Sequence, residues 1–227
     1  MPTRTRASFA PLLARGWLSQ QAPAFQGQLL DRLSLTIFPS GATIYTPGDP
    51  PGGIYGLIRG SIGVTIAPGK AGPHLAHVAV PGSWFGEGSF LTGRPRRVGL
   101  EAATECVLAY LALADMEKLV GGDPEVMRAF AAIAMINIDM ALRAVEDLLI
   151  ADPERRVAAV LWRASGGQAG QSIPMTQADL GHLANASRKF TLQALKALTG
   201  RGLLRQGYRH IDILEPERLR GFADGEA

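Results

Sequence analysis

The sequence predicts an α+β fold in three parts: an N-terminal β-roll, one long helix and a C-terminal winged helix-turn-helix. Three observations support this prediction. Short runs of β-forming residues alternate with Gly and Pro from residue 37 to about residue 113. A stretch without Gly or Pro follows from Glu125 to Asp152, and a pair of capped helices is expected between Met175 and Leu204. We place the parts at residues 1–120, 121–151 and 152–227.

Composition narrows the class of protein. The 227 residues are 47% hydrophobic and 19% charged, which is ordinary for a chain that buries a core. The net charge is only +3, so any basic surface must be local. Cys106 is the only cysteine, which excludes an internal disulfide and argues against a cysteine-ligated metal centre. No signal peptide or run of eighteen apolar residues is present, so we expect a cytoplasmic protein without a membrane span.

The N-terminal part begins with residues 1 to about 20, which carry little pattern and are interpreted as a mildly basic leader. Apolar side chains at helical spacing then predict a short helix over residues 22–33. The β-forming runs after it are short and are separated by regular turn signals, which favours a roll or barrel over α/β units. We expect strands at residues 43–45, 54–58, 62–66, 77–80 and 107–113.

A Gly-rich turn inside the β region is the first candidate binding site. Gly86 and Gly88 would let the backbone approach a ligand closely, and N–H groups at the start of a short helix hold anions. Glu87 could accept a hydrogen bond from a sugar hydroxyl, and Arg97 could fork onto a phosphate. By chemistry alone, such a pattern is more often an ordinary turn.

The long helix is predicted to begin at Asp123-Pro124 and to end before Pro153. Its length of about 25 residues is roughly twice that of a usual globular helix. We therefore favour a homodimer seam over a core helix of a single domain. The apolar residues with a seven-residue period, which we expect at this seam, are Met127, Ala131, Ala134, Ile138, Ala141, Val145 and Leu148. An adjoining stripe consists of Phe130, Ile133, Asn137 and Met140.

The helix pair near the C-terminus has clear local signals. Thr176 is predicted to cap the first helix, with Asp179 returning the bond as in a capping box. Asn185 tolerates a left-handed backbone and allows a sharp turn. Ser187 is predicted to cap a second helix, which runs to about Thr199.

The outer face of the second helix is the stronger candidate site. Between Arg188 and Arg209 there are six cations and no acid, and such a block attracts phosphate. Residues 203–214 then predict a hairpin with a basic tip, the wing, and a polar tail from Glu215 onward. The alternative is a helical hairpin with a solvated basic face. We expect DNA contacts from Thr176, Ser187, Arg188, Lys189, Gln193, Lys196 and Arg209.

In the order and spacing of its β region, long helix and C-terminal helix pair, the chain resembles the Crp/Fnr family of bacterial transcription regulators from about Ile37 to Leu214. The resemblance implies a cyclic-nucleotide-binding-like jelly roll, a dimerisation helix, and a winged helix-turn-helix on a palindromic operator of double-stranded DNA. It also implies RNA polymerase as a partner. The segments that carry it are Ile58-Arg59-Gly60-Ser61, Phe85-Gly86-Glu87 with Arg97 ten residues past the Glu, Asp123-Pro124, Leu180-Gly181 and Ser187-Arg188.

The resemblance also implies an effector site in the roll. In family members that bind cyclic nucleotides, the counterpart of Glu87 contacts the ribose and that of Arg97 the phosphate. Val98 stands where a Ser usually adds a phosphate contact, and Ala141 stands where a purine-contacting Thr is found. The effector is expected to be a cyclic nucleotide (cAMP or cGMP), with a different small molecule or none as alternatives. The expected site residues are Gly86, Glu87, Gly88, Arg97, Val98 and Ala141.

The second helix of the pair departs from the family pattern too. Arg188 matches a guanine-reading Arg, Lys189 replaces a common Glu, and Gln193 replaces a second Arg. Lys cannot accept a hydrogen bond from cytosine, so an operator different from the family's best-known one is expected. Phe190 and Leu192 are unusually apolar for this helix, and only local packing accounts for them at this point.

Other functions and sites are compatible with parts of the sequence. One rival is an effector-binding module that acts through protein partners, with a degenerate DNA domain; another is a family member that binds DNA without any ligand. An enzyme acting on nucleotides lacks a nucleophile or metal cluster, so we expect no catalysis. His74 and His77 lie in a predicted loop and are either metal or haem ligands or two surface histidines. Cys106 is expected to be a buried small residue.

Overall fold

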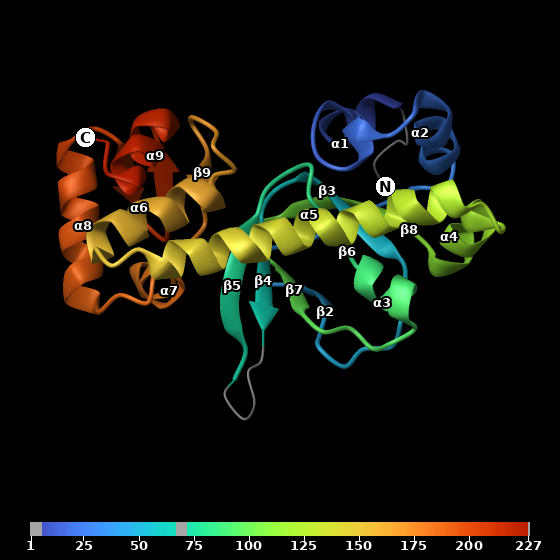
Figure 1. The fold of residues 1–227 in the computed structure, drawn as a ribbon, viewed down its shortest axis with the longest axis horizontal. Helices are drawn as coiled ribbons and strands as arrows, with labels where there is room; N and C mark the ends of the chain where they lie inside the picture. The colour runs from blue at the N-terminus through green and yellow to red at the C-terminus, as the bar shows by residue number, and fades with distance from the viewer. Residues whose placement is uncertain (1–5, 67–71, 227) are drawn as a thin grey trace. The chain divides into compact units, whose positions relative to one another are not determined.

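A computed structural model describes residues 6–66 and 72–226 of the chain. Contacts within the chain divide it into two compact units. The N-terminal unit comprises Met1–His74 and Ala79–Ile138, and the C-terminal unit comprises Leu75–Val78 and Asp139–Ala227. The α+β class predicted from the sequence is confirmed: short helices and then strands come first, followed by a long helix and a helical unit with a small sheet (Figure 1).

Two four-stranded sheets with the orders β1-β8-β3-β6 and β2-β7-β4-β5 form the predicted β-roll. Their paired strands run antiparallel, as in the β3 and β8 pair that joins Leu57 to Leu108. Leu57 and Leu108 of one sheet and Ile62 and Leu100 of the other are all buried in one shared cluster. The strands are β1 (Ser34–Phe38), β2 (Thr43–Tyr45), β3 (Ile54–Arg59), β4 (Ile62–Ile66), β5 (His74–Ala79), β6 (Trp84–Phe85), β7 (Gly99–Ala102) and β8 (Cys106–Leu111).

The segment expected to be a leader is instead part of the core. Phe9, Leu12 and Trp17 are buried, and the Trp17 ring stacks on Phe130 at 5.8 Å between centroids. The indole Nε1 of Trp17 also donates to the carbonyl of Ala129 at 2.5 Å. The prediction was wrong because these apolar residues lie in two short helices and a turn, with no repeating period. The helices before and beside the strands are η1 (Arg6–Phe9), α1 (Ala10–Ala14), η2 (Leu18–Gln20), α2 (Pro23–Leu30), α3 (Glu87–Thr92) and α4 (Leu113–Val120).

The long helix is α5 (Pro124–Leu149), 26 residues in one piece. It begins where predicted, with the Asp123 carboxylate accepting from the N–H of Glu125 at 2.9 Å. The two apolar stripes have different environments, because Phe130 and Ile133 are buried against the roll. The large residues of the other stripe remain exposed in the single chain, and the structure adds three that the period missed. The exposed large apolar residues of α5 are Met127, Met135, Ile138, Leu142, Val145, Leu148 and Leu149.

The C-terminal unit combines four helices with a three-stranded sheet of order β10-β11-β9. Asp152 caps α6 by accepting from the N–H groups of Glu154 and Arg155. The elements are α6 (Pro153–Ala164), β9 (Ser172–Ile173), α7 (Gln177–Leu183), α8 (Arg188–Gly200), β10 (Leu204–Gly207), β11 (His210–Ile213) and α9 (Pro216–Asp224) (Figure 1).

The expected polar tail is also wrong, because α9 packs against α6. Leu219 and Ala223 are buried in the core of the unit. Arg155 of α6 fixes the end of α9 by donating to the carbonyl of Ala223 at 3.0 Å. The two apolar positions are four residues apart, one helical turn, but the charged residues around them hide the pattern.

Candidate nucleic-acid interface and effector site

The turn between α7 and α8 is built as the sequence predicts. Thr176 accepts from the N–H of Asp179 at 3.1 Å, and the Asp179 carboxylate accepts from the N–H of Thr176 at 3.0 Å, which completes the capping box. Asn185 adopts a left-handed backbone with φ of 43°. Ser187 then caps α8 by accepting from the N–H of Phe190 at 3.4 Å. These short-range bonds fix where α8 begins.

Two further residues hold the turn against the rest of the unit. Gly181 lies where α7 meets α8, and a Cβ there would come within 3.1 Å of the Thr191 hydroxyl. Arg156 of α6 donates to the carbonyls of Ile150 at 2.5 Å and Asn185 at 3.1 Å, and also to that of Ala184. Sequence reasoning missed Arg156, because its partners are distant or are main-chain groups. The start of α8 is thus rigidly placed.

The outer face of α8 is exposed and cationic. Its inner face buries Thr191, Ala194, Leu195 and Leu198. In the part of the chain that the structure describes, none of the outer polar residues forms an ion pair within the fold. These exposed residues are Arg188, Lys189, Gln193 and Lys196. They remain available to a polyanion.

The predicted wing is the β10–β11 hairpin, in which Gly207 pairs with His210. Arg209 at its tip has a left-handed backbone with φ of 59°. Arg205 is exposed and donates to the Asp212 carboxylate at 2.9 Å. Hydrogen bonds from Ser172 and Arg205 lower the pKa of Asp212 below its usual value. Of the six expected cations, at least Arg205 has a carboxylate partner on the neighbouring strand.

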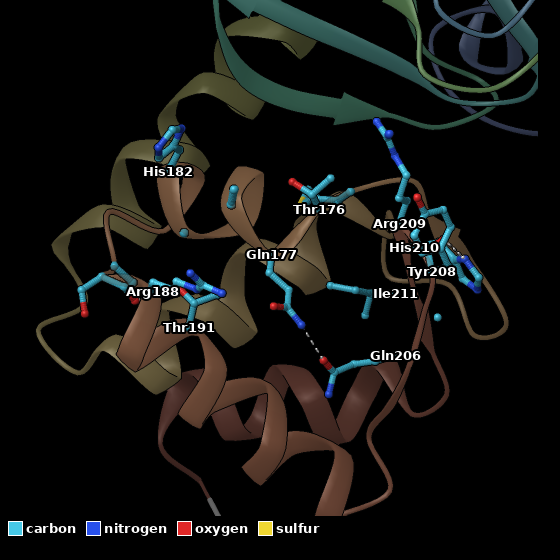
Figure 2. A pocket seen from close by; sticks show the side chains of 16 residues that line it. Thr176, Gln177, His182, Arg188, Thr191, Gln206, Tyr208, Arg209, His210 and Ile211 are labelled. Carbon is cyan, nitrogen blue, oxygen red and sulfur yellow. Dashed lines mark hydrogen bonds between the residues drawn. The ribbon is translucent and has the colours of Figure 1, made fainter.

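A hollow of about 770 Å³ lies between the wing and the start of α8. Figure 2 shows the side chains of α7, α8 and the wing that border it. Gln206 donates to the Thr199 hydroxyl at 3.1 Å and accepts from Gln177 at 3.3 Å, which ties the wing to both helices. The lining includes Thr176, Ser187, Arg188 and Arg209, which were expected to contact DNA, and no carboxylate.

The second candidate site lies at the start of α3. Glu87 is buried there and accepts from the side-chain amide of Asn137 on α5 at 3.0 Å. The same amide nitrogen donates to the carbonyl of Trp84 at 3.1 Å. Burial raises the pKa of Glu87, while the bond from Asn137 acts in the opposite direction. Asn137 therefore links the candidate effector site to the long helix.

Arg96, not the expected Arg97, points into this site. Its Nη1 donates to the carbonyl of Gly86 at 2.8 Å, its Nη2 donates to that of Gly53 at 2.7 Å, and its guanidinium lies 4.5 Å from the ring centre of Tyr45. Gly86 has φ of 105°, and a Cβ there would lie 2.6 Å from Arg96 Nη1, so this position requires glycine twice over.

The other expected effector residues are placed as follows. Arg97 is exposed, and Val98 is half-buried against the core of the roll. Gly88 has open space where a Cβ would stand. Ala141 is exposed and belongs to the C-terminal unit. The two neighbouring arginines therefore differ in environment, since Arg96 is buried and Arg97 is exposed, and Arg97 stays a prediction.

A third buried charge cluster lies in the C-terminal unit. The Arg163 guanidinium of α6 donates to the Asp147 carboxylate at 2.7 Å and to His77 Nδ1 at 3.2 Å. Burial and the charge of Arg163 lower the pKa of His77 to about 3. The expected loop around His74 and His77 is wrong, since both lie on β5. His77 is bonded to a cation, which opposes metal binding at that nitrogen.

Two features of the described residues bear on other classes of function. No group of three or more His, Cys, Asp or Glu side chains gathers in residues 6–66 and 72–226 as a metal site would require. Within the same residues, no helix has the length and apolar character needed to span a membrane. Cys106 is buried, as expected, and burial raises the pKa of its thiol.

Comparison with known proteins agrees with the division of the chain into an N-terminal and a C-terminal unit. Residues 35–123 match the family model of the cyclic nucleotide-binding domain, and residues 155–222 match that of the Crp-like helix-turn-helix domain. The chain is 24% identical over 216 residues to the CRP-like cAMP-activated global transcriptional regulator of Mycobacterium tuberculosis, covering 92% of this chain and 96% of that one.

Two solved structures share the fold. FixK2 from Bradyrhizobium japonicum matches with a TM-score of 0.70 at 21% identity, over 84% of this chain and 96% of that one. TTHA1359, a CRP/FNR-family regulator from Thermus thermophilus, matches with a TM-score of 0.65 at 23% identity, over 84% and 98%. At this identity, the two matches support the fold alone.

Proposed function

The chain belongs to the Crp/Fnr family of transcription regulators, and from that premise we propose that it is a homodimeric, sequence-specific DNA-binding protein controlled by a cyclic nucleotide in the β-roll. The observation that carries the proposal is the capped, exposed start of α8, with Arg188, Lys189 and Gln193 on its outer face. Arg pairs with guanine and Gln with adenine in the major groove. Arg209 on the wing would meet the phosphate backbone.

The exposed apolar face of α5 supports a dimer. Its large residues are between 38% and 77% exposed in the single chain, and water disfavours such a continuous stripe. A second copy would cover it with the same face and place two reading helices about one DNA turn apart. Val145→Glu should yield monomers in sedimentation. Arg143→Glu, exposed on the same helix but outside the predicted seam, should leave dimers.

The site at the start of α3 supports an anionic effector that carries a hydroxyl. A guanidinium has five N–H donors, and Arg96 uses two of them on the carbonyls of Gly53 and Gly86, so donors remain for a phosphate. Glu87 could accept from a ribose hydroxyl, in competition with Asn137. A cyclic nucleotide has both groups. The methyl side chain of Ala141 cannot form a hydrogen bond that would distinguish adenine from guanine.

The alternative is a regulator that binds DNA without a ligand. Arg96 favours it in one respect, because its guanidinium is already bonded to main-chain carbonyls and stacked on Tyr45. A ligand would have to compete with those contacts. Equal affinity for DNA with and without cAMP or cGMP, in a chain that binds neither, would select this alternative.

The test begins with selection of binding sites from random duplex DNA, followed by fluorescence anisotropy with and without each nucleotide. We expect a palindromic site, tighter binding with a nucleotide, and loss of binding in Arg188→Ala. Arg218→Ala removes an exposed arginine from α9, away from the hollow, and should bind normally. Failure to bind any duplex at low salt would refute the proposal. A regulator of this kind would also contact RNA polymerase.

A further inference from the structure

Two apolar side chains stand exposed on the helix that is proposed to read DNA. Leu192 is 40% exposed and Phe190 is 45% exposed. Leu192 is not among the residues packed on the core of the C-terminal unit. Local packing therefore does not explain it, although the sequence alone allowed no other account.

The two residues lie on different sides of α8. At 100° per residue, Leu192 falls on the ridge between Arg188, one turn before it, and Lys196, one turn after it. Phe190 lies about 160° away around the helix. It borders a separate hollow of about 760 Å³ whose lining includes Asp152 and Glu154. Gln193 and Lys196 line the same hollow, so Phe190 lies near both acids and a cation, whereas the helical neighbours of Leu192 one turn away are both cations.

The chemistry of the major groove narrows what Leu192 can meet. Base edges there present hydrogen-bond donors and acceptors, and the one apolar group is the C5 methyl of thymine. If Leu192 packed against a polar base edge, the polar group would lose its hydrogen bonds to water, and leucine could not replace them. Against a methyl group, it would bury apolar surface on both sides.

We propose that Leu192 is a specificity-determining residue that reads the C5 methyl group of one thymine in each half-site, beside the base contacted by Arg188. The inference rests on the proposed DNA-binding function and deepens it. Burying one methyl group is worth about a fourfold change in affinity, so a symmetric operator would gain about 15-fold from two.

The experiment replaces each thymine of the selected operator, one symmetric pair at a time, by deoxyuridine. Deoxyuridine keeps the pairing edge and lacks only the methyl group. We expect one pair of positions where the wild-type protein binds the uridine operator about 15-fold more weakly. In Leu192→Ala this penalty should vanish. Leu214→Ala removes a leucine that is equally exposed, at 40%, outside α8, and should keep the full penalty.

The outcomes distinguish failure of the proposed methyl contact from failure of the proposed DNA-binding function. If the protein binds its operator but no deoxyuridine position weakens it, the inference is overturned and DNA binding stands. A penalty that persists in Leu192→Ala also overturns it, because another residue would then read the methyl group. Absence of binding to every duplex would refute the proposed function itself, and the inference with it.

Discussion

Two buried arginines, one in each unit, are held in opposite ways. Arg163 is 5% exposed and is bonded to the Asp147 carboxylate, with the neutral ring of His77 as a second partner. Arg96 is 6% exposed and bonds to main-chain carbonyls and the face of Tyr45. Within residues 6–66 and 72–226, no carboxylate forms an ion pair with Arg96.

The difference concerns charge, because both arginines have hydrogen-bond partners. A buried cation without a counterion is costly, and folding alone gives no reason to keep one. The charge of Arg163 is neutralised inside the unit, so its role is structural. Arg96 forms no such ion pair among the described residues, although it interacts at longer range with the charges of Glu87 and Asp49. The comparison supports the proposal that Arg96, unlike Arg163, takes part in binding an anionic effector.

The largest effect should come from removing the counterion that Arg163 has. Asp147→Ala leaves a buried guanidinium unpaired, and we expect the free energy of unfolding to fall by about 3–5 kcal/mol in urea titrations followed by circular dichroism. Replacing both residues, with Arg163→Met and Asp147→Leu, should restore most of the loss.

A matched control is the exposed pair of Arg59 and Glu105, whose N–O distance of 2.8 Å is nearly that of the buried pair. Glu105→Ala should change stability by less than about 1 kcal/mol, because water screens this pair. Equal losses at the two pairs would show that burial does not set the strength of the Arg163 contact.

The next effect concerns the arginine without a counterion. Arg96→Met should weaken cyclic-nucleotide binding about 10- to 150-fold in calorimetric titration, as expected for loss of charge-assisted hydrogen bonds. Arg96→Lys keeps the charge but cannot span the two carbonyls, and should recover only part of the affinity. Arg97→Met, one residue on and exposed, should bind like the wild type. If only Arg97→Met lost nucleotide binding, Arg97, ten residues past Glu87, would be the phosphate contact.

The Arg163 cluster also predicts a pH dependence. The unfolded chain protonates His77 near pH 6.5, whereas the folded chain resists protonation until about pH 3. Its contribution to stability is therefore complete above pH 6.5 and declines by about 1.4 kcal/mol per unit as pH falls below it. Between pH 7.5 and 5, we expect a loss of about 2 kcal/mol in the wild type.

Urea titrations across this range test the sign. His77→Gln keeps an acceptor for Arg163 but cannot titrate, so its stability should fall less steeply toward pH 5. Burial raises the pKa of Asp147, and that carboxylate works in the opposite direction at the acidic end. The contribution of Asp147 is common to the wild type and His77→Gln, so it cancels in the difference between their stabilities. Parallel curves would exclude His77 as the source.

Features set by nearby residues were predictable from the sequence. The caps of α7 and α8 depend on side chains within three positions, so Thr176, Asp179 and Ser187 could be assigned without a fold. The β-roll was predictable too, because its Gly and Pro residues mark each turn locally. The left-handed turn at Asn185 follows from the same short-range chemistry.

Features that depend on distant partners were not predictable. His77 and Arg163 are 86 residues apart in sequence, and nothing local marks them as neighbours. The choice between Arg96 and Arg97 depended on which side of an extended segment faces Gly53. The packing of Trp17 depends on Phe130, far along the chain. In each case the local pattern was compatible with more than one environment, and only the fold selects among them.

The smallest effect, at Asn137, sharpens the comparison by leaving both arginines in place. Asn137→Ala removes the amide that joins Glu87 to α5, at a cost of about 1 kcal/mol in stability. The bond from Asn137 lowers the pKa of Glu87, so in the variant that pKa should rise further. The variant should therefore lose more stability than the wild type as pH increases through the pKa of Glu87.

If the amide of Asn137 transmits the effector signal, the ratio of DNA affinities with and without nucleotide should fall about fivefold in the same variant. Arg143→Ala, exposed on the same helix and outside the predicted seam, should keep the ratio. A normal ratio in Asn137→Ala would mean that the signal reaches α5 by another route and that Asn137 only supports the fold.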